Sequence, residues 1–394
     1  MLASKIIPML LMSSVLVACG GGTGASLSTT TTTTTTTPTG SNSNTTTNNN
    51  TGTSTATTGD SSTATGNTTT SGARLLTRNV VDAAYSDALE RLITVSSLPD
   101  NALTLINPAT GEQQAVVLTL TPTSVAISPD GKTAVVGHNN AVTQVNLQTA
   151  SVTNSHNNLN MSVFDLALDA QGIAYATPKT NEIAGALKSI NLNTGLVTAS
   201  LSVVQAGSFY LQLAPNLKAL YLLDKGAQPV DLAKADASIT PPAWLYDSPY
   251  NGDHDIGGAT GKGLWLSEDE AYLLTAGETL FRTANTQDQD MLYQRSLSDN
   301  DNDPTTTLLH ADHSQEAGKF VVILDKGIAG VNTDYRLKTY TAPQLVVSDE
   351  QKLSTMNLNN SSNPVIPQFV FFNSDGSKRY ALLKQGTETY LLTF

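Results

Sequence analysis

The stretch Ser124-Val-Ala-Ile-Ser-Pro-Asp-Gly-Lys-Thr-Ala-Val-Val-Gly137 decides the fold. An apolar strand runs into the turn Ser-Pro-Asp-Gly and a second apolar strand follows, because Asp and Gly readily take the backbone angles of a tight turn. A second clear copy extends from Phe369 to Leu383, and weaker copies turn near Ser86-Asp87, Asp169 to Gly172, Pro215-Asn216, Glu268-Asp269 and His313 to Gln315. This repeated strand–turn–strand unit predicts an all-β protein.

The spacing of these turns indicates how many strands each unit contains. Successive turns lie about 40 to 60 residues apart, near the period of four-stranded propeller blades. The early units also carry a second hairpin signal, at Ile106 to Glu112, Val145 to Ser151 and Ile190 to Leu196. We therefore expect a single β-propeller of seven four-stranded blades over residues 73–394, with six or eight blades as the alternatives.

The two ends of this region predict how the ring closes. The last unit has only three strands, expected at Gln368 to Asn373, Arg379 to Lys384 and Thr389 to Phe394. The apolar segment from Ala73 to Arg78 has no place in its own unit. We expect that segment to add the missing outer strand to the last blade, which would also cover a sheet edge that invites aggregation.

The Ser-Pro-Asp-Gly turns and the hairpins of the type Asn-Leu-Gln-Thr resemble those of the YVTN and lactonase-like group of seven-bladed propellers. The resemblance covers most of residues 80–200 and the last 25 residues, and it fades between them. It implies a fold and brings no catalytic residue with it.

The first 18 residues read as an export signal. Lys5 supplies the positive charge, and the run from Ile6 to Val17 is apolar but shorter than the roughly 20 residues of a membrane-spanning helix. Leu16-Val17-Ala18-Cys19 resembles the lipobox of bacterial lipoproteins, and Cys19 is the only cysteine in the chain. The resemblance implies cleavage before Cys19, lipidation of its sulfur and an anchor in the outer membrane, on either its periplasmic or its cell-surface side.

The composition of residues 19–72 predicts a disordered linker, here called the stalk. Thr, Ser, Asn and Gly dominate it, Thr29 to Thr37 is unbroken Thr, and Asp60 is its only charge. Such a segment has no apolar side chains whose burial could offset the entropy lost on ordering the backbone. Its hydroxyl groups could also carry O-linked glycans. The whole chain has a formal charge of −12, which disfavours nucleic-acid binding. We expect a monomer whose partners are the lipid bilayer and a protein or glycan.

Three long insertions, at Ile239 to Lys262, Ser298 to Thr306 and Ala342 to Pro367, are expected to share one face of the propeller. Loops gathered on one face favour a binding surface, with tolerated surface loops as the alternative. The first insertion contains side chains suited to carbohydrate or peptide recognition, although Trp244 also suits the role of pinning the loop to the protein body. The candidate ligand-binding residues are Trp244, Tyr246, Tyr250, Asp253, His254 and Asp255.

Two further clusters suggest metal sites. Asp299, Asp301 and Asp303 alternate along the second insertion, as carboxylates do in calcium loops. The EF-hand pattern is broken, however, by Pro304 in the position of its Gly and His310 in that of its last Glu. Calcium is thus one interpretation and a solvated acidic loop the other. His310, Asp312 and His313 are candidate zinc ligands, although zinc normally takes three or four with defined geometry.

The sequence favours a non-catalytic propeller that binds a protein, glycan or envelope component through its insertion-bearing face. We find no metalloprotease, serine-hydrolase, Walker or dinucleotide motif in it. One alternative is a lactonase-like hydrolase that uses His254 or His310. Another is an assembly factor working in the periplasm.

Overall fold

The computed structural model describes residues 72–179, 187–200, 208–225, 230–250, 252–258, 263–297, 306–328 and 331–394. The expected signal peptide and lipidated Cys19, with all of the stalk except Gly72, lie outside the described residues. In the described part, every regular element is a β-strand except the 3-10 helix η1 (Gln287–Gln289). No described helix has the length and apolar character needed to cross a bilayer. The all-β prediction is confirmed.

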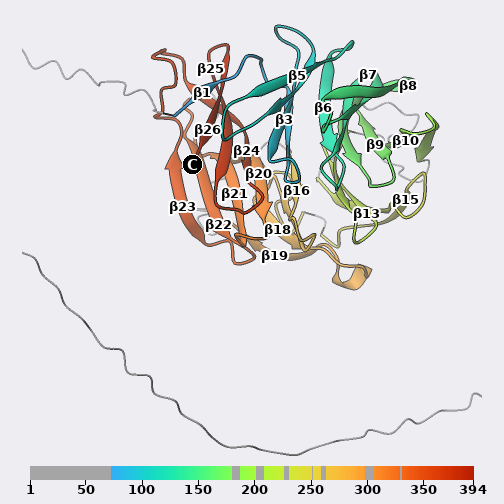
Figure 1. Ribbon diagram of the computed structural model, residues 1–394. Helices are drawn as coiled ribbons and strands as arrows, with labels where there is room; N and C mark the ends of the chain where they lie inside the picture. The colour runs from blue at the N-terminus through green and yellow to red at the C-terminus, as the bar shows by residue number, and fades with distance from the viewer. Residues whose placement is uncertain are drawn as a thin grey trace, which may run out of the picture. The chain divides into compact units, whose positions relative to one another are not determined.

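The described strands form six antiparallel sheets, five of them with four strands (Figure 1). The first two four-stranded sheets contain β2 (Asp82–Ser86), β3 (Arg91–Ser96), β4 (Ala102–Ile106) and β5 (Gln113–Val117), and β12 (Phe209–Ala214), β13 (Ala219–Asp224), β14 (Leu232–Asp236) and β15 (Ala243–Asp247). The next two contain β16 (Leu264–Leu266), β17 (Tyr272–Thr275), β18 (Thr279–Arg282) and β19 (Leu292–Ser296), and β20 (Thr307–Ser314), β21 (Lys319–Asp325), β22 (Tyr335–Thr341) and β23 (Val347–Lys352). The fifth contains β24 (Val365–Phe372), β25 (Arg379–Gln385), β26 (Glu388–Thr393) and β1 (Arg74–Leu75).

The sixth sheet has six strands and corrects the expected count of seven blades. Its strands are β6 (Pro122–Ile127), β7 (Thr133–Asn146), β8 (Ser151–Leu168), β9 (Ile173–Pro178), β10 (Leu187–Asn191) and β11 (Val197–Ser200). β7 pairs with β6 up to His138 and with β8 from Asn139 onward, while β8 turns to β9 from Val163. The structure therefore has six sheets rather than seven, because these two long strands join two of the expected units into one sheet.

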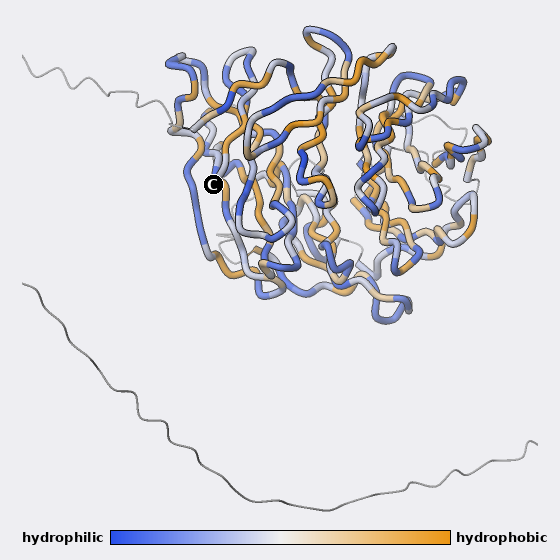
Figure 2. The backbone as a smooth tube through the Cα atoms, in the orientation of Figure 1, coloured by the Kyte–Doolittle hydropathy of each residue, from blue (hydrophilic) through white to orange (hydrophobic). Residues whose placement is uncertain are grey.

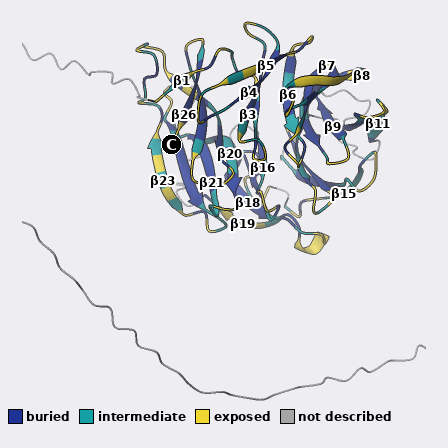
Figure 3. Ribbon diagram, in the orientation of Figure 1, coloured by how far each residue is buried: buried dark blue, intermediate teal, exposed yellow. Residues whose placement is uncertain are grey.

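The first strands of the units stand side by side around a common centre. β2 lies beside β6, β6 beside the second half of β8, and the order continues through β12, β16, β20 and β24 back to β2. Apolar residues of neighbouring sheets pack together in shared core clusters. Much of the backbone of these sheets is coloured as hydrophobic in Figure 2 and as buried in Figure 3. The six-stranded sheet packs its own two halves together through Val135, Val142, Leu166 and Ala174.

Local hydrogen bonds explain why the predicted turns form where they do. In the first copy, Ser128 Oγ donates to Asp130 Oδ1 over 2.6 Å, and Asp130 Oδ1 also accepts from Lys132 N at 3.1 Å. Gly131 has φ +70°, a left-handed angle that favours glycine. Asn373 donates to Asp375 in the last copy in the same way, at 2.7 Å. Because the side chains that hold these turns belong to the turns themselves, the turns could be predicted from the sequence.

The predicted closure of the ring is confirmed. β1 adds to the outer edge of β26, with Arg74 opposite Leu391 and Leu75 opposite Tyr390. The next residue, Leu76, donates its backbone N–H to Thr389 O at 2.8 Å and is buried in the core between the first and last sheets. The first described residues thus fasten the last sheet.

Leu76→Ala is expected to lower the free energy of unfolding by about 2 kcal/mol, the lower end of the cost of a buried Leu truncation. The matched control is its neighbour Leu75→Ala, because the Leu75 side chain is 52% exposed and should change stability by less than about 0.5 kcal/mol. Urea unfolding of the two variants measures both values. Equal effects would contradict a role for Leu76 in closing the ring.

Candidate functional site

The inner strands surround an open cavity of about 1030 Å³, here called the central channel. Its wall includes residues from β2, β6, β8, β12, β16, β20 and β24. A second cavity of about 330 Å³ shares Gln212, Trp265 and His310 with it and extends toward Asp87 and Asp312. Every sheet contributes residues to the wall of the channel.

Carboxylates on three inner strands, Asp82 and Asp165 in the channel wall and Asp312 in the wall of the second cavity, each accept a backbone N–H from the next inner strand. Asp82 Oδ2 accepts the N–H of Val125 at 2.8 Å, and Asp165 Oδ2 accepts that of Leu211 at 2.8 Å. Asp312 Oδ2 accepts the N–H of Phe372 on β24 at 2.7 Å. Inner strands are edge strands with unpaired N–H groups, so these bonds satisfy donors that the sheets leave over.

The surrounding protein shifts the titration of these groups. Burial raises the pKa of Asp82 to about 6, and it raises the pKa of Asp165 and Asp312 to about 7 each. Burial also lowers the pKa of His310 to about 4, although its Nδ1 accepts the N–H of Val370 at 3.3 Å. At neutral pH the imidazole is therefore uncharged, and a larger share of these carboxyls is protonated than of an exposed aspartate.

The other end of the channel is also acidic. Burial, followed by the charges of Glu268 and Glu90, raises the pKa of Asp87 to about 6. Glu268 Oε2 accepts the N–H of Gln315 at 2.7 Å. Among the described residues, neither cavity has a Lys or Arg in its wall. The channel therefore presents negative potential from end to end.

Solved structures identify this architecture. The chain is similar to the β-propeller domain of Cps50 (Swd1) from Myceliophteria thermophila, with a TM-score of 0.61 over 82% of this chain and 98% of that one. The chain is a β-propeller. Sequence identity with that domain is 9%, so the likeness shows the fold alone. No family model and no curated protein matches the sequence.

The propeller places two of the predicted ligand-binding residues on a strand instead of in a loop. Residues 239–242 form the turn before β15, and Trp244 and Tyr246 belong to β15 itself. Trp244 packs against the core beside β12–β15. Tyr246 Oη donates to the buried Asp290 at 3.1 Å. Pro241-Pro242 and the polar residues around this outer strand hid it from the strand pattern.

The other predicted residues lie in the loop that leads from β15 to β16. His254 stacks on Tyr293 with 4.0 Å between ring centroids and meets the edge of Tyr250 at 4.6 Å. Tyr250 Oη accepts the N–H of Tyr293 at 3.0 Å. A Cβ on Gly277 would lie 2.2 Å from Asp255 O, so the loop rests directly on the turn between β17 and β18. Asp253 and Asp255 are exposed.

The metal predictions have different outcomes. Asp299, Asp301 and Asp303 lie outside the described residues, so the calcium site stays a prediction. His310 and His313 each accept a backbone N–H through Nδ1, from Val370 and Glu268 respectively. Within the described ranges, no group of three or more His, Cys, Asp or Glu side chains is placed to hold a metal ion. The suggested zinc cluster is therefore wrong, because its side chains serve neighbouring strands.

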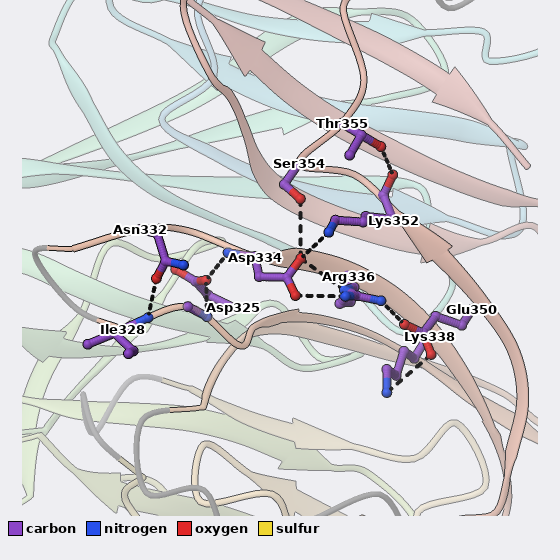
Figure 4. Close-up of polar contacts among 11 residues, drawn as sticks. Asp325, Ile328, Asn332, Asp334, Arg336, Lys338, Glu350, Lys352, Ser354 and Thr355 are labelled. Atoms are coloured by element: carbon purple, nitrogen blue, oxygen red, sulfur yellow. Dashed lines mark hydrogen bonds and ion pairs between the residues drawn. The ribbon is translucent and has the colours of Figure 1, made fainter.

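A second charged cluster lies on and next to β22 and β23, and of these two strands β23 falls within the expected third insertion (Figure 4). Arg336 binds Asp334 at 2.7 Å and also Glu350. Lys338 lies 3.4 Å from Glu350, and Lys352 lies 3.4 Å from Asp334. These charges compensate one another across paired strands, so the cluster stabilises the outer edge of the sheet and offers a ligand little unmet charge.

Asp82 and Asp165 were missed from the sequence although a spacing signal exists for them, and Asp312 was named only as a candidate zinc ligand. Asp82 and Asp165 each stand four residues before the turn residue that ends their strand, at Ser86 and Asp169. His310 has the same place relative to Ser314. A polar residue at one fixed position of the repeat therefore marks the channel wall.

Proposed function

We propose that the protein is a membrane-tethered, non-catalytic binding propeller that takes its ligand in the central channel. The observation that carries this proposal is the open cavity of about 1030 Å³ formed by every sheet. That volume matches the upper range of small-molecule and peptide sites. A ligand seated there contacts all parts of the ring at once.

The use of the polar groups in the channel favours binding over catalysis. The carboxylates of Asp82, Asp165 and Asp312 each accept a backbone N–H from the neighbouring inner strand. His310 accepts one as well, and His254, outside the channel wall, stacks on Tyr293. These two histidines were the basis of the hydrolase alternative. Groups occupied in fastening the scaffold are poorly suited to move a proton.

Photo-crosslinking in cells tests the ligand site. A benzoylphenylalanine in place of Leu309, in the channel wall, is expected to capture a specific adduct. The control places the same residue at Val117, which is 70% exposed on the outer strand β5. An adduct from Val117 and none from Leu309 would overturn the channel as the binding site.

The tether is part of the proposal and follows from Cys19. Replacement Cys19→Ser removes the only thiol that could carry a lipid, so the protein should move almost completely from the membrane to the soluble fraction. Ser26→Ala, in the stalk, is the matched control and should stay with the membrane. Retention of the Cys19→Ser protein in washed membranes would contradict a lipid anchor.

A further inference from the structure

One wall of the channel combines aromatic rings with carboxylates. Phe164 and Tyr210 meet edge to face with 5.0 Å between ring centroids. Asp165 is the next residue after Phe164, and Asp82 lies on the neighbouring part of the wall. Aromatic faces and carboxylates together form the usual binding environment of organic cations, because both carry negative potential.

The ring of Phe164 already contacts an ammonium group. Lys225 Nζ lies 4.3 Å from its centroid. Lys225 follows the end of β13 and is exposed, and it is not part of the channel wall. A lysine of the same chain thus shows that the ring is accessible to an alkylammonium group and oriented to accept one.

We propose that the channel binds a ligand bearing an alkylammonium group, which sits on the Phe164 ring in place of Lys225 while Asp82 and Asp165 supply the opposite charge. This inference rests on the proposed channel site and names its ligand chemistry. A free diamine and a lysine side chain of a peptide both supply such a group. The volume of the channel admits a single extended chain or a small molecule, and it excludes a folded domain.

Calorimetric titration of the full-length protein tests the chemistry. Four probes are compared in two pairs. The first pair is 1,5-diaminopentane and its neutral counterpart 1,5-pentanediol, and the second is a tripeptide with one central lysine and the same peptide with norleucine. The charged probe of each pair is expected to bind, and its neutral counterpart should bind at least tenfold more weakly. The diamine and peptide arms show which source of ammonium the channel prefers.

Two variants give opposite signs and separate the ring contact from general charge effects. Phe164→Leu should weaken binding about five- to tenfold, the range expected for one partly desolvated cation–aromatic contact. Lys225→Met should strengthen binding, because the internal competitor is gone. Lys179→Met is the matched control, since Lys179 directly follows β9 as Lys225 directly follows β13, and its removal changes net charge equally.

Equal binding of charged and neutral probes, or equal effects of Lys225→Met and Lys179→Met, would overturn the inference. In that outcome a channel-specific adduct at Leu309 would leave the proposed function standing. Binding of the diamine without an adduct at Leu309 would support the ligand chemistry and contradict the proposed function.

Discussion

Asp290→Ala is expected to lower the free energy of unfolding by about 3–5 kcal/mol, the cost of leaving a buried charge without its partner. Asp290 and Lys234 form an ion pair 2.8 Å long, with side chains 0% and 3% exposed. Without the carboxylate, Lys234 Nζ keeps Ala284 O, at 2.6 Å, as its hydrogen-bond acceptor. The buried ammonium would then have this carbonyl as its hydrogen-bond acceptor and the rings of Tyr221 and Tyr246, at 5.2 and 5.7 Å, as its other neighbours.

Lys234→Met is expected to cost less than Asp290→Ala. Asp290 would still accept hydrogen bonds from Tyr221 Oη at 2.9 Å, Tyr246 Oη at 3.1 Å and Ala284 N at 2.7 Å. Three donors compensate a buried carboxylate far better than one carbonyl compensates an ammonium. Loss of Asp290 should therefore lower the free energy of unfolding more than loss of Lys234.

The double variant Lys234→Met/Asp290→Leu separates charge burial from loss of packing. Replacing both charges with apolar groups of similar size is often close to neutral, so the double variant should be more stable than Asp290→Ala alone. Urea unfolding followed by tryptophan fluorescence measures all three. If Asp290→Ala fails to fold, a folded double variant still supports the argument, and a double variant at least as unstable as Asp290→Ala would contradict it.

This ion pair also shows what a sequence can and cannot predict here. Lys234 on β14 and Asp290 in the connection between β18 and β19 lie 56 residues apart, and nothing near either residue marks the contact. The turn at Asp130, by contrast, is fixed by Ser128 and Lys132, its own neighbours. The local turns and the four-stranded unit were therefore predictable, because they depend on residues close together in the sequence. The closing strand was predictable because the last unit lacked a strand.

The errors have the same origin. The merging of two expected units depends on whether β7 and β8 continue without a break, and this is decided by pairings such as Asn139 with Ser162. Trp244 looked like a loop aromatic because the pairing of β15 with β14 is interrupted by a shift of register between Lys234 and Ala235. Outer strands are the least regular of each sheet, so their side chains are the easiest to misplace.

The natural protein is expected to become more stable as the pH falls from 8 to 5. The triple variant Asp82→Asn/Asp165→Asn/Asp312→Asn should lose most of this gain in stability. The folded-state pKa values are raised to about 6, 7 and 7, above the ordinary value of 3.8. The folded state therefore binds more protons than the unfolded state between pH 4 and pH 7. By linkage, these groups stabilise the fold as pH falls from 8 to 5.

The expected size follows from the same shifts. One pKa unit corresponds to about 1.4 kcal/mol, but the three carboxyls are only half-buried in the channel wall, where water screens their charge. We therefore expect about 1–2 kcal/mol for each carboxyl and about 3–5 kcal/mol for all three between pH 8 and pH 5. At pH 8 the Asn variants should be the more stable proteins, because they have no charge to bury.

His310 has the opposite effect on stability as the pH falls, so a separate variant tests it. Its folded-state pKa is lowered to about 4, below the ordinary 6.5, so the fold loses stability as pH falls from 6.5 toward 4. His310→Gln should remove this loss while the carboxyl gain remains. Asp375→Asn is the surface control: Ser377 and Asn373 lower the pKa of Asp375, so its contribution is present at neutral pH and fades only in acid. A triple variant whose stability follows the natural protein at every pH would show that the channel carboxyls titrate normally, and the negative potential of the channel would then be fully present at pH 5.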